Sequence, residues 1–422
     1  MMKQMKPSGI EWVGDIPIDW CVKPIRAEFN EVTRKNSDGR VKTALKFTYG
    51  EIVRKDNFDS DEDAYVADTI LNYTVVTPGT IMLNGLNLNF DFVTQRIGLV
   101  QETGVITSAY MAFKPSSGRV LPEYATYLFK AYDSCKAFHN MGGGVRKILN
   151  FSELKKCYMV YPSTTVQKRI VKHLDYVCKE IADLISEIET QIAILEQYKR
   201  SVITECVTKG LQKELATADS GVQWIGSMPP HWRIKRGKYI LKYIQKPVKE
   251  GDGVITCFRD GEVTLRSNRR EDGFTMSDKE IGYQGIDVGD LVVHGMDGFA
   301  GAIGISDSRG KASPVLNVLD TKQNKRYIMY YLRSMAYSDV FLALATGIRV
   351  RSCDLRWNKL AELSYPVPPL DEQEAIVEHI DNMIAKTDAV IADKKAQLET
   401  LEEYKKSLIF EYVTGKKEVP SA

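Results

Sequence analysis

Few residues of this chain are arranged in a way that could support catalysis, and each candidate motif fails at a required position. Gly304–Lys311 is similar to a phosphate-binding loop, but it is one residue too long, and Ala312 stands where a magnesium-binding Ser or Thr is needed. Phe299–Gly304 comes close to the F-x-G-x-G motif of methyl-donor sites, but Ile303 occupies the last glycine position. The five histidines are scattered, without an H-E-x-x-H pair or a nucleophile elbow. The sequence therefore predicts no catalytic and no metal-binding residue.

Basic residues beside glycine offer a different chemistry, the binding of nucleic acid. Each half of the chain contains a glycine followed by an apolar residue and an arginine, in Gly144–Arg146 and in Gly347–Arg349. Such a glycine can end a helix in the left-handed conformation, and its basic neighbours can equally contact DNA phosphates or guanine edges. Further basic clusters fall in presumed loops, where a solvated surface is the alternative. The candidate DNA-binding residues are Arg34, Lys35, Arg40, Lys42, Arg146, Lys147, Arg266, Arg269, Arg270, Arg349 and Arg351.

The composition permits nucleic-acid binding without demanding it. The 422 residues carry a formal net charge of +2, but residues 216–370 contain 22 Lys and Arg against 17 Asp and Glu, whereas residues 371–422 contain 7 against 12. Binding to phosphates depends on such local charge more than on the total. The seven cysteines form no C-x-x-C pair, and no apolar run is long enough to span a bilayer. We expect a cytoplasmic globular protein with reduced thiols and without a signal peptide.

The chain repeats itself once, at about half its length. SGIEWVGDIPIDW at residues 8–20 returns as SGVQWIGSMPPHW at residues 220–232, and the shared Trp, Gly and Pro keep one offset of 212. The segments EQYKRSVITECVTKG and EEYKKSLIFEYVTGK form a second pair. Gly and Pro exclude a regular helix from the first motif, so we expect an extended arm whose tryptophans pack on the following domain, with stacking on bases as the alternative. The pattern predicts a duplicated half-protein.

A long helical segment follows each globular stretch. In the first, apolar residues are spaced by four and three residues alternately, as in a coiled coil, and after Ile188 the pattern shifts to Ile192 and Leu195 as in a stutter. The second begins near Asp371, a credible N-cap with Glu374 at the capping-box position. Each helix would be roughly 60 Å long and would pair with the other, a homodimer being the alternative. The predicted seam residues are Ile170, Leu174, Val177, Ile181, Leu184, Ile188, Ile376, Ile380, Ile384, Ile391, Leu398 and Leu401.

These patterns predict an α+β protein in which two duplicated globular domains are separated by two long helices with pseudo-two-fold symmetry. The frames of the two halves match while their middles differ, which favours two different recognition surfaces over a duplicated catalyst. The predicted segments are a first domain at residues 1–162, a first helix at 163–212, a second domain at 213–368, a second helix at 369–416 and a tail at 417–422.

On these residues the chain resembles the specificity subunit of a type I restriction–modification system. The resemblance is carried by the paired motifs at residues 8–20 and 220–232, by YPVPPLDEQEAIVEHI at residues 365–380 and by the two helix endings. It covers nearly the whole chain. One departure is that YPSTTVQKRIV at residues 161–171 lacks the acidic form of the matching segment.

The resemblance implies a non-enzymatic DNA-binding protein. Its two target recognition domains would each read one half of a bipartite double-stranded target, and its two antiparallel helices would set the spacer between the halves. Two methylation subunits would bring S-adenosylmethionine, restriction subunits would bring ATP and Mg, and this chain itself would bind no cofactor. The alternatives are a duplicated-domain protein-interaction scaffold without a DNA role, and a nuclease or methyltransferase with a degenerate motif.

Overall fold

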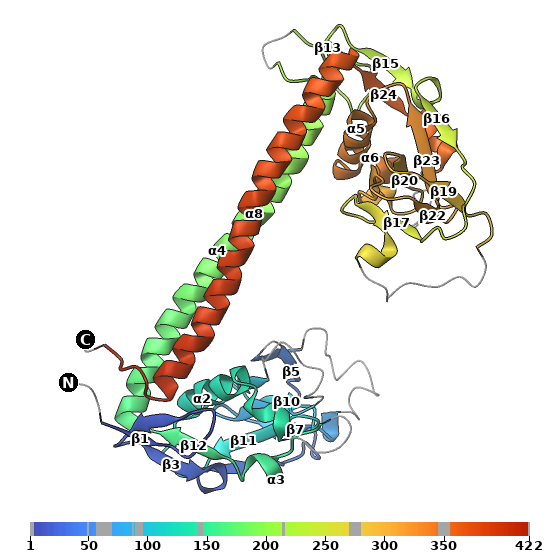
Figure 1. Cartoon of the computed structure of the whole chain (residues 1–422). Coiled ribbons are helices and arrows are strands. Elements are labelled where there is room, and N and C mark those ends of the chain that lie inside the picture. Colours follow the sequence, from blue (N-terminus) through green and yellow to red (C-terminus); the bar gives the residue numbers. More distant parts are fainter. Residues whose placement is uncertain are drawn as a thin grey trace. The chain divides into compact units, whose positions relative to one another are not determined.

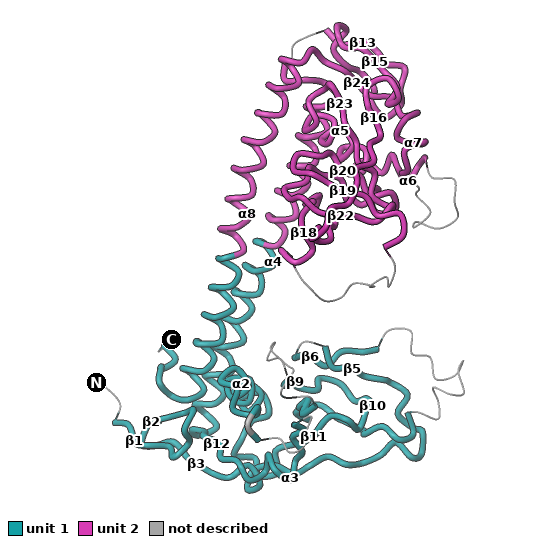
Figure 2. The backbone as a smooth tube through the Cα atoms, turned by 45° about the vertical axis from the view of Figure 1, so that its right-hand side comes forward, with its two compact units in different colours: residues 1–188, 396–422 teal, residues 189–395 magenta. Residues whose placement is uncertain are grey.

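The structure is a computed structural model that describes residues 4–48, 50–55, 70–86, 88, 96–141, 147–212, 216–269, 280–344 and 355–420. It falls into two compact units, unit 1 with residues 1–188 and 396–422 and unit 2 with residues 189–395 (Figure 2). Each unit contains one globular domain and a part of both long helices, α4 (Thr164–Lys209) and α8 (Leu370–Val413). The helices therefore pack with the domains, instead of forming segments of their own.

The globular domain of unit 1 is built on a four-stranded antiparallel sheet in the order β4-β11-β8-β9, with helix α2 against β9. Figure 1 shows α2 and β11 of this domain. Two-stranded ladders β1-β2, β3-β12, β5-β6 and β7-β10 accompany it among the described residues. Helix α2 has a proline in its first turn, where no backbone donor is needed. The elements are β1 (Met5–Pro7), β2 (Asp15–Pro17), β3 (Cys21–Pro24), η1 (Ile25–Ala27), β4 (Phe29–Glu31), β5 (Leu45–Thr48), β6 (Glu51–Arg54), β7 (Thr74–Val76), β8 (Ile81–Leu83), β9 (Ile97–Leu99), β10 (Gly104–Ile106), β11 (Met111–Pro115), α2 (Pro122–Ser134), η2 (Ala137–Asn140), α3 (Phe151–Leu154) and β12 (Tyr158–Tyr161).

The globular domain of unit 2 repeats this topology. Its four-stranded antiparallel sheet has the order β16-β23-β20-β21, and α5 packs against β20 and β21. Helix α5 is capped by the side chain of Asn324. The predicted class, α+β with duplicated domains and two long helices, is confirmed. The elements are β13 (Ala218–Asp219), β14 (Ser227–Met228), β15 (Arg233–Arg236), η3 (Gly237–Tyr239), β16 (Leu241–Ile244), β17 (Ile255–Cys257), β18 (Val263–Leu265), η4 (Arg266–Asn268), β19 (Gln284–Ile286), β20 (Leu291–His294), η5 (Gly298–Ala300), β21 (Ile303–Ile305), β22 (Gly310–Ala312), β23 (Leu316–Thr321), α5 (Lys325–Tyr337), α6 (Val340–Ala343), α7 (Trp357–Glu362) and β24 (Ser364–Val367).

Helices α4 and α8 run antiparallel. In unit 1 the beginning of α4 shares a core with the end of α8, and in unit 2 the end of α4 shares a core with the beginning of α8. Most of the predicted seam residues are removed from solvent. Those that are buried are Ile170, Leu174, Ile181, Ile188, Ile376, Ile380 and Ile391, and those that are half-buried are Val177, Ile384, Leu398 and Leu401.

Leu184 is a seam prediction that the structure contradicts. Its side chain is 43% exposed, whereas Ile185 packs against the core of unit 1. The inward positions are therefore Val177, Ile181 and Ile185. Two steps of four residues follow each other, where a heptad pattern would alternate steps of four and three. An α-helix drifts relative to an ideal heptad, and an extra step of four corrects that drift. The stutter lies at Ile181–Ile185, earlier than the shift expected after Ile188.

The start of α8 also differs from the prediction. The first helical hydrogen bond runs from the Gln373 amide to the Pro369 carbonyl (3.0 Å), so Pro369 occupies the N-cap position. Asp371 lies inside the first turn, together with Glu372. The fixed φ of proline suits the entry into a helix, and carboxylates in the first turn are stabilised by the helix dipole.

The helix seam in unit 2 contains polar contacts. Thr387 is buried there, at 7% exposed. Lys394 Nζ of α8 donates to Gln191 Oε1 of α4 (2.5 Å), and Lys199 Nζ of α4 donates to Asp388 Oδ1 of α8 (2.5 Å). Polar residues at seam positions fix the register of a helix pair.

One buried tyrosine in each unit joins the domain to both long helices. Tyr124 on α2 directs its hydroxyl at the carbonyl of Val413 at the end of α8 (2.9 Å) and at that of Val160 in β12, just before α4 (3.2 Å). Tyr327 on α5 makes the matching contacts in unit 2, with Val207 near the end of α4 and with β24 before α8 (both 3.1 Å). Burial raises the pKa of both phenols well above the usual value, so they remain neutral donors.

A buried glutamine fixes the turn before each long helix. Gln167 accepts a hydrogen bond from the Leu121 amide (2.8 Å), and Gln373 accepts one from the Asn324 amide (3.0 Å). Each also donates to the carbonyl five residues before it, at 2.9 Å in both units. The departure from the acidic form in the first half therefore leaves the glutamine contacts intact.

Tyr124→Phe and Tyr327→Phe are each expected to lower the free energy of unfolding by about 1–2 kcal/mol, because buried carbonyls lose their donor. Urea unfolding of the full chain would measure the change. Tyr404→Phe is the matched control, since Tyr404 is 51% exposed. Losses of the same size in all three variants would contradict the role of the two hydroxyls.

Candidate nucleic-acid interface

The repeated tryptophan motif packs on the end of a long helix in each unit. Trp20 and Trp232 are each 3% exposed. Trp20 lies against Gly415 and Trp232 against Gly210, and both glycines have a φ of +74°. A Cβ on Gly415 would be 2.5 Å from Pro17 Cδ and 3.0 Å from Trp20 Cζ2, so the dihedral and the close approach both require glycine. The packing interpretation of the motif is confirmed, and these two rings are not available for stacking on bases.

The two copies of this tryptophan differ in their hydrogen bonding. Trp232 Nε1 donates to Glu372 Oε1 (3.0 Å), and the other oxygen of that carboxylate contacts His231 Nε2 (2.8 Å). Trp20 Nε1 is buried and has no hydrogen-bond partner among the described residues. Val166 stands in the place of Glu372, because each directly precedes the equivalent buried glutamine. An unpartnered buried donor costs about 1–3 kcal/mol. The missing acidic residue in the segment at residues 161–171 therefore acts on the hydrogen bonding of Trp20.

The predicted basic cluster of unit 1 lies on the connection between β4 and β5. The buried Asn36 side chain orders this connection by accepting from the Val41 amide (3.1 Å) and donating to the Val41 carbonyl (2.8 Å). Arg40 pairs with Asp38 at 3.4 Å and remains largely exposed. The structure thus brings together on one ordered loop the exposed residues Arg34, Lys35, Arg40 and Lys42.

Lys35 has an equivalent in unit 2 that the sequence analysis missed. Isolated bridges at Lys35 and at Lys246 join the loop to the matching strands β7 and β19. Lys35 Nζ donates to Ser108 Oγ, whereas Lys246 Nζ donates to Asp287 (2.8 Å) and to Asp290 (2.7 Å). The residues around the two lysines differ, so no sequence signal reveals the match. Both lysines anchor a loop.

Arg309 extends the ion pairs around Lys246. Its guanidinium contacts Asp252 (2.8 Å) and Asp287 (2.5 Å). Hydrogen bonds from Lys246 and Arg309 lower the pKa of Asp287 to about 2. The network ties the β16–β17 connection to the strands beside it.

The predicted basic cluster of unit 2 lies on and beside η4. The Arg269 guanidinium stands 4.2 Å from the centroid of the Phe258 ring and pairs with Asp260 (2.8 Å) and Glu262 (3.2 Å). Its charge is therefore partly balanced and its orientation is fixed, while Arg266 is half-buried. This cluster follows β18, whereas the cluster of unit 1 precedes β5, so the two occupy different places in one topology.

Of the remaining candidate DNA-binding residues, only Lys147 lies within the described residues. Arg146, Arg270, Arg349 and Arg351 lie outside the described residues, so both interpretations of the Gly-apolar-Arg segments stay predictions. Lys147 is described, with a φ of +39°, and its carbonyl accepts the Leu88 amide at 3.2 Å.

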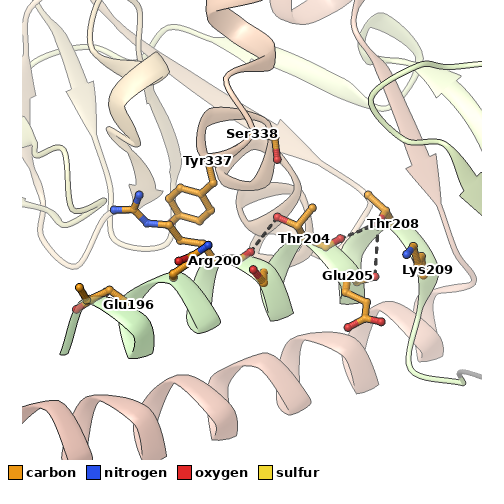
Figure 3. Close-up of a pocket in the computed structure, with 11 residues that line it drawn as sticks. Glu196, Arg200, Thr204, Glu205, Thr208, Lys209, Tyr337 and Ser338 are labelled. Atoms are coloured by element: carbon orange, nitrogen blue, oxygen red, sulfur yellow. Dashed lines mark hydrogen bonds between the residues drawn. The ribbon is translucent and has the colours of Figure 1, made fainter. Parts of the chain in front are cut away.

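A pocket of about 780 Å³ lies between α4 and the end of α5 in unit 2 (Figure 3). The Arg200 guanidinium stands 5.3 Å from the centroid of the Tyr337 ring on its wall. The hydroxyls of Thr204 and Thr208 donate to carbonyls of their own helix (2.9 and 2.7 Å), and the lining contains no histidine or cysteine. The lining is largely polar and offers no activated nucleophile.

The described ranges contain neither a cluster of metal ligands nor a membrane-spanning helix. There, no group of three or more His, Cys, Asp or Glu residues is placed to hold a metal ion. No helix in the same ranges combines the length and the apolar character needed to cross a membrane.

Comparison with known proteins gives consistent results, although no family model matches the chain. A protein of Methanocaldococcus jannaschii described as a putative type I restriction enzyme MjaX specificity subunit is 23% identical over 433 residues, covering 96% of this chain and 95% of that protein. A chain from a structure solved for complex assembly and conformational transition of the type I restriction–modification system has a TM-score of 0.68 at 13% identity, covering 95% of this chain and 99% of that one. The HsdS subunit of Thermoanaerobacter tengcongensis is 13% identical with a TM-score of 0.49, covering 95% and 98%.

The chain thus has the fold of a subunit of type I restriction–modification systems. The resemblance to the specificity subunits of these systems, seen first in the repeated motifs, is confirmed over nearly the whole length.

Acid is expected to weaken the ion-pair network of unit 2. The pKa of Asp287 is about 2 in the folded chain, below its ordinary value of 3.8. A depressed pKa stabilises the folded state above the ordinary value, and this contribution is lost as the pH falls from about 4 towards 2. The Tm difference between the wild-type chain and Asp287→Asn should therefore shrink over that range in thermal melts. Asp183→Asn, which alters an exposed pair on α4, is the control, and a constant difference for Asp287→Asn would contradict the assignment.

Proposed function

We propose that the chain is the sequence-specific DNA-binding subunit of a type I restriction–modification complex. The observation that supports this best is that the two domains share the same contacts to the long helices but carry different basic surfaces. The contacts of Tyr124 and Gln167 recur at Tyr327 and Gln373, whereas the basic clusters occupy different elements of the two domains. Two domains of one topology with different basic surfaces suit the recognition of two different half-sites.

Each domain would read one half of a bipartite double-stranded target. Phosphate contacts from ordered basic loops position a protein on DNA, and contacts to base edges supply specificity. The loop ordered by Asn36 in unit 1 and the η4 region in unit 2 are the described surfaces best suited to these roles.

The helices α4 and α8 would set the spacer between the half-sites. The support is that they are continuous over 46 and 44 residues, run antiparallel, and each contribute to both units. A continuous helix pair with a fixed register resists changes in length.

Two methylation subunits would dock on helix surfaces outside the seam. Exposed large apolar side chains mark such contact sites. On α4 and α8 they include Tyr176, Leu184, Ile194, Tyr198, Val390 and Tyr404. These subunits would bring S-adenosylmethionine, and restriction subunits would bring ATP and Mg, so that this chain supplies no catalytic residue and binds no cofactor.

A mobility-shift experiment distinguishes this proposal from its alternatives. The chain with its methylation subunit is mixed with fragments of the source genome at low and at moderate salt, and a subset of fragments should shift at both. If no fragment shifts, the protein-interaction scaffold is favoured. Methylation or cleavage by the purified chain alone would favour the degenerate-enzyme alternative.

Arg34→Ala and Arg266→Ala are expected to affect different half-sites. Loss of one base or phosphate contact costs about 1–3 kcal/mol, which corresponds to a roughly fivefold or larger loss of affinity. The measurement is competition binding with targets that are altered in one half-site or the other. Lys406→Ala, which removes a cation from α8, is the control, and an equal loss at both half-sites in both arginine variants would count against separate reading.

Shortening both helices by one heptad should shorten the preferred spacer. Deletion of residues 189–195 and 390–396 removes about 10 Å of helix, or about three base pairs at 3.4 Å each. The preferred spacer is measured with a series of targets of increasing spacer length. Replacing the same heptads by others of equal length is the control, and an unchanged optimum after the deletion would refute the spacer role.

A further inference from the structure

The turn between β17 and β18 carries an exposed arginine, Arg259, which the charge pattern of the sequence did not single out. Its side chain is 64% exposed, and its Nη2 donates to Asp297 Oδ1 at 2.9 Å. Asp297 lies on the connection between β20 and β21, so this contact joins two connections of one domain. An arginine has five N–H donors, and its exposed remainder can bind a partner outside the chain.

Close contacts of two glycines fix the backbone around Arg259. A Cβ on Gly301 would stand 2.8 Å from the Arg259 carbonyl oxygen, and a Cβ on Gly304 would stand 2.0 Å from the carbonyl oxygen of Gly261. Only glycine lets β21 and the turn before it approach the β17–β18 turn this closely. The position of Arg259 is therefore set by the packing of the two connections.

The carboxylate that contacts Arg259 is itself held in place. His294 Nδ1 accepts hydrogen bonds from the amides of Met296 (3.2 Å) and Asp297 (2.9 Å). Burial lowers the pKa of His294, which favours the neutral ring that can accept at this nitrogen. The Asp297 carbonyl accepts from the Ala300 amide at 2.9 Å. Arg259 is thus oriented before a partner arrives, which lowers the entropy cost of binding.

The surroundings of Arg259 suit base edges better than phosphates. Nearby, Arg269 pairs with Asp260 and Glu262, so positive charge on this surface is accompanied by carboxylates. Phosphate binding depends on an excess of positive charge, whereas base edges in the major groove present both donors and acceptors. Met296, which is 52% exposed on the β20–β21 connection, adds an apolar group that can contact a thymine methyl.

We propose that Arg259, oriented by Asp297, reads a guanine in the half-site bound by unit 2. A guanidinium can donate two hydrogen bonds to guanine O6 and N7, the commonest specific contact in the major groove. Arg269 is less suited to this role, because the Phe258 ring and two carboxylates already surround its guanidinium. The inference rests on the proposed DNA-binding function and adds to it a residue and the base that it contacts.

Competition binding by the complex of this chain with its methylation subunit tests the assignment. The probes are duplexes of the target, identified from the fragments that shift, in which each base pair is replaced in turn. Arg259→Ala should lower discrimination roughly fivefold to 150-fold at one G·C pair of one half-site and leave the other positions unchanged. Arg236→Ala is the matched control, since Arg236 is 59% exposed and pairs with Glu362 at 2.6 Å. It should leave discrimination unchanged at every position.

Two further variants separate a base contact from a phosphate contact and from a structural role. Arg259→Lys keeps the charge but lacks the planar fork, so discrimination should fall at the same base pair as in Arg259→Ala. Asp297→Ala should also lower discrimination at that pair. Adding it to Arg259→Ala should cause no further loss, because Asp297 acts through Arg259.

The outcomes that would overturn the proposal are distinct. A uniform loss of affinity for all duplexes in Arg259→Ala, restored in Arg259→Lys, would assign Arg259 to a phosphate. Unchanged discrimination in Arg259→Ala would refute the guanine contact and leave the proposed function intact. If the wild-type complex does not discriminate between duplexes at all, the proposed function fails together with this inference.

Discussion

The hydroxyl of a buried tyrosine is the contact on which the arrangement of each unit depends. Carbonyls at the end of a helix have no partner within the helix, and in each unit such a carbonyl is reached by the tyrosine of the neighbouring domain, Tyr124 or Tyr327. The same hydroxyl also contacts the strand that leads into the other long helix. The tryptophan arm packs on that helix end, two residues beyond the contacted carbonyl of Val413 in unit 1. Domain, arm and both helices are thereby positioned at one place.

The two copies keep this frame but satisfy their other buried polar groups differently. Trp224 Nε1 donates to the Tyr331 hydroxyl (3.1 Å), whereas Trp12 Nε1 in unit 1 is buried without a partner among the described residues. Conversely, Glu28 is fully buried in unit 1 and accepts hydrogen bonds from Tyr161 (2.7 Å) and other donors. Burial raises the pKa of Glu28, but the bonds from Ser117, Tyr161 and Arg119 outweigh that effect and keep the pKa below its usual value. Each copy has therefore diverged in its interior as well as on its surface.

Periodicity and repetition in the sequence predicted the duplication, the long helices and most of their seam, because these depend on local spacing. Leu184 was misplaced because one extra step of four residues turns the apolar stripe, and that step shows only when the partner helix is present. Tyr124 and Tyr327 were not singled out, since EYATYL and RYIMYY share only two tyrosines at matching positions. The basic clusters were visible as charge, but the pairing of Arg269 with Asp260 depends on how the chain folds back on itself.

The polar contacts in the helix seam have a consequence for how errors in assembly are avoided. Two long helices with purely apolar stripes could slide past each other by seven residues and still bury Ile, Leu and Val against one another. Such a slip would separate Lys394 from Gln191 and Lys199 from Asp388. Lys199 would keep its pairing with Glu196 of the same helix (3.4 Å), but Lys394 would leave its acceptor on the partner helix. The misaligned pair is thus penalised within the seam itself, in addition to the contacts that each globular domain makes with the helices.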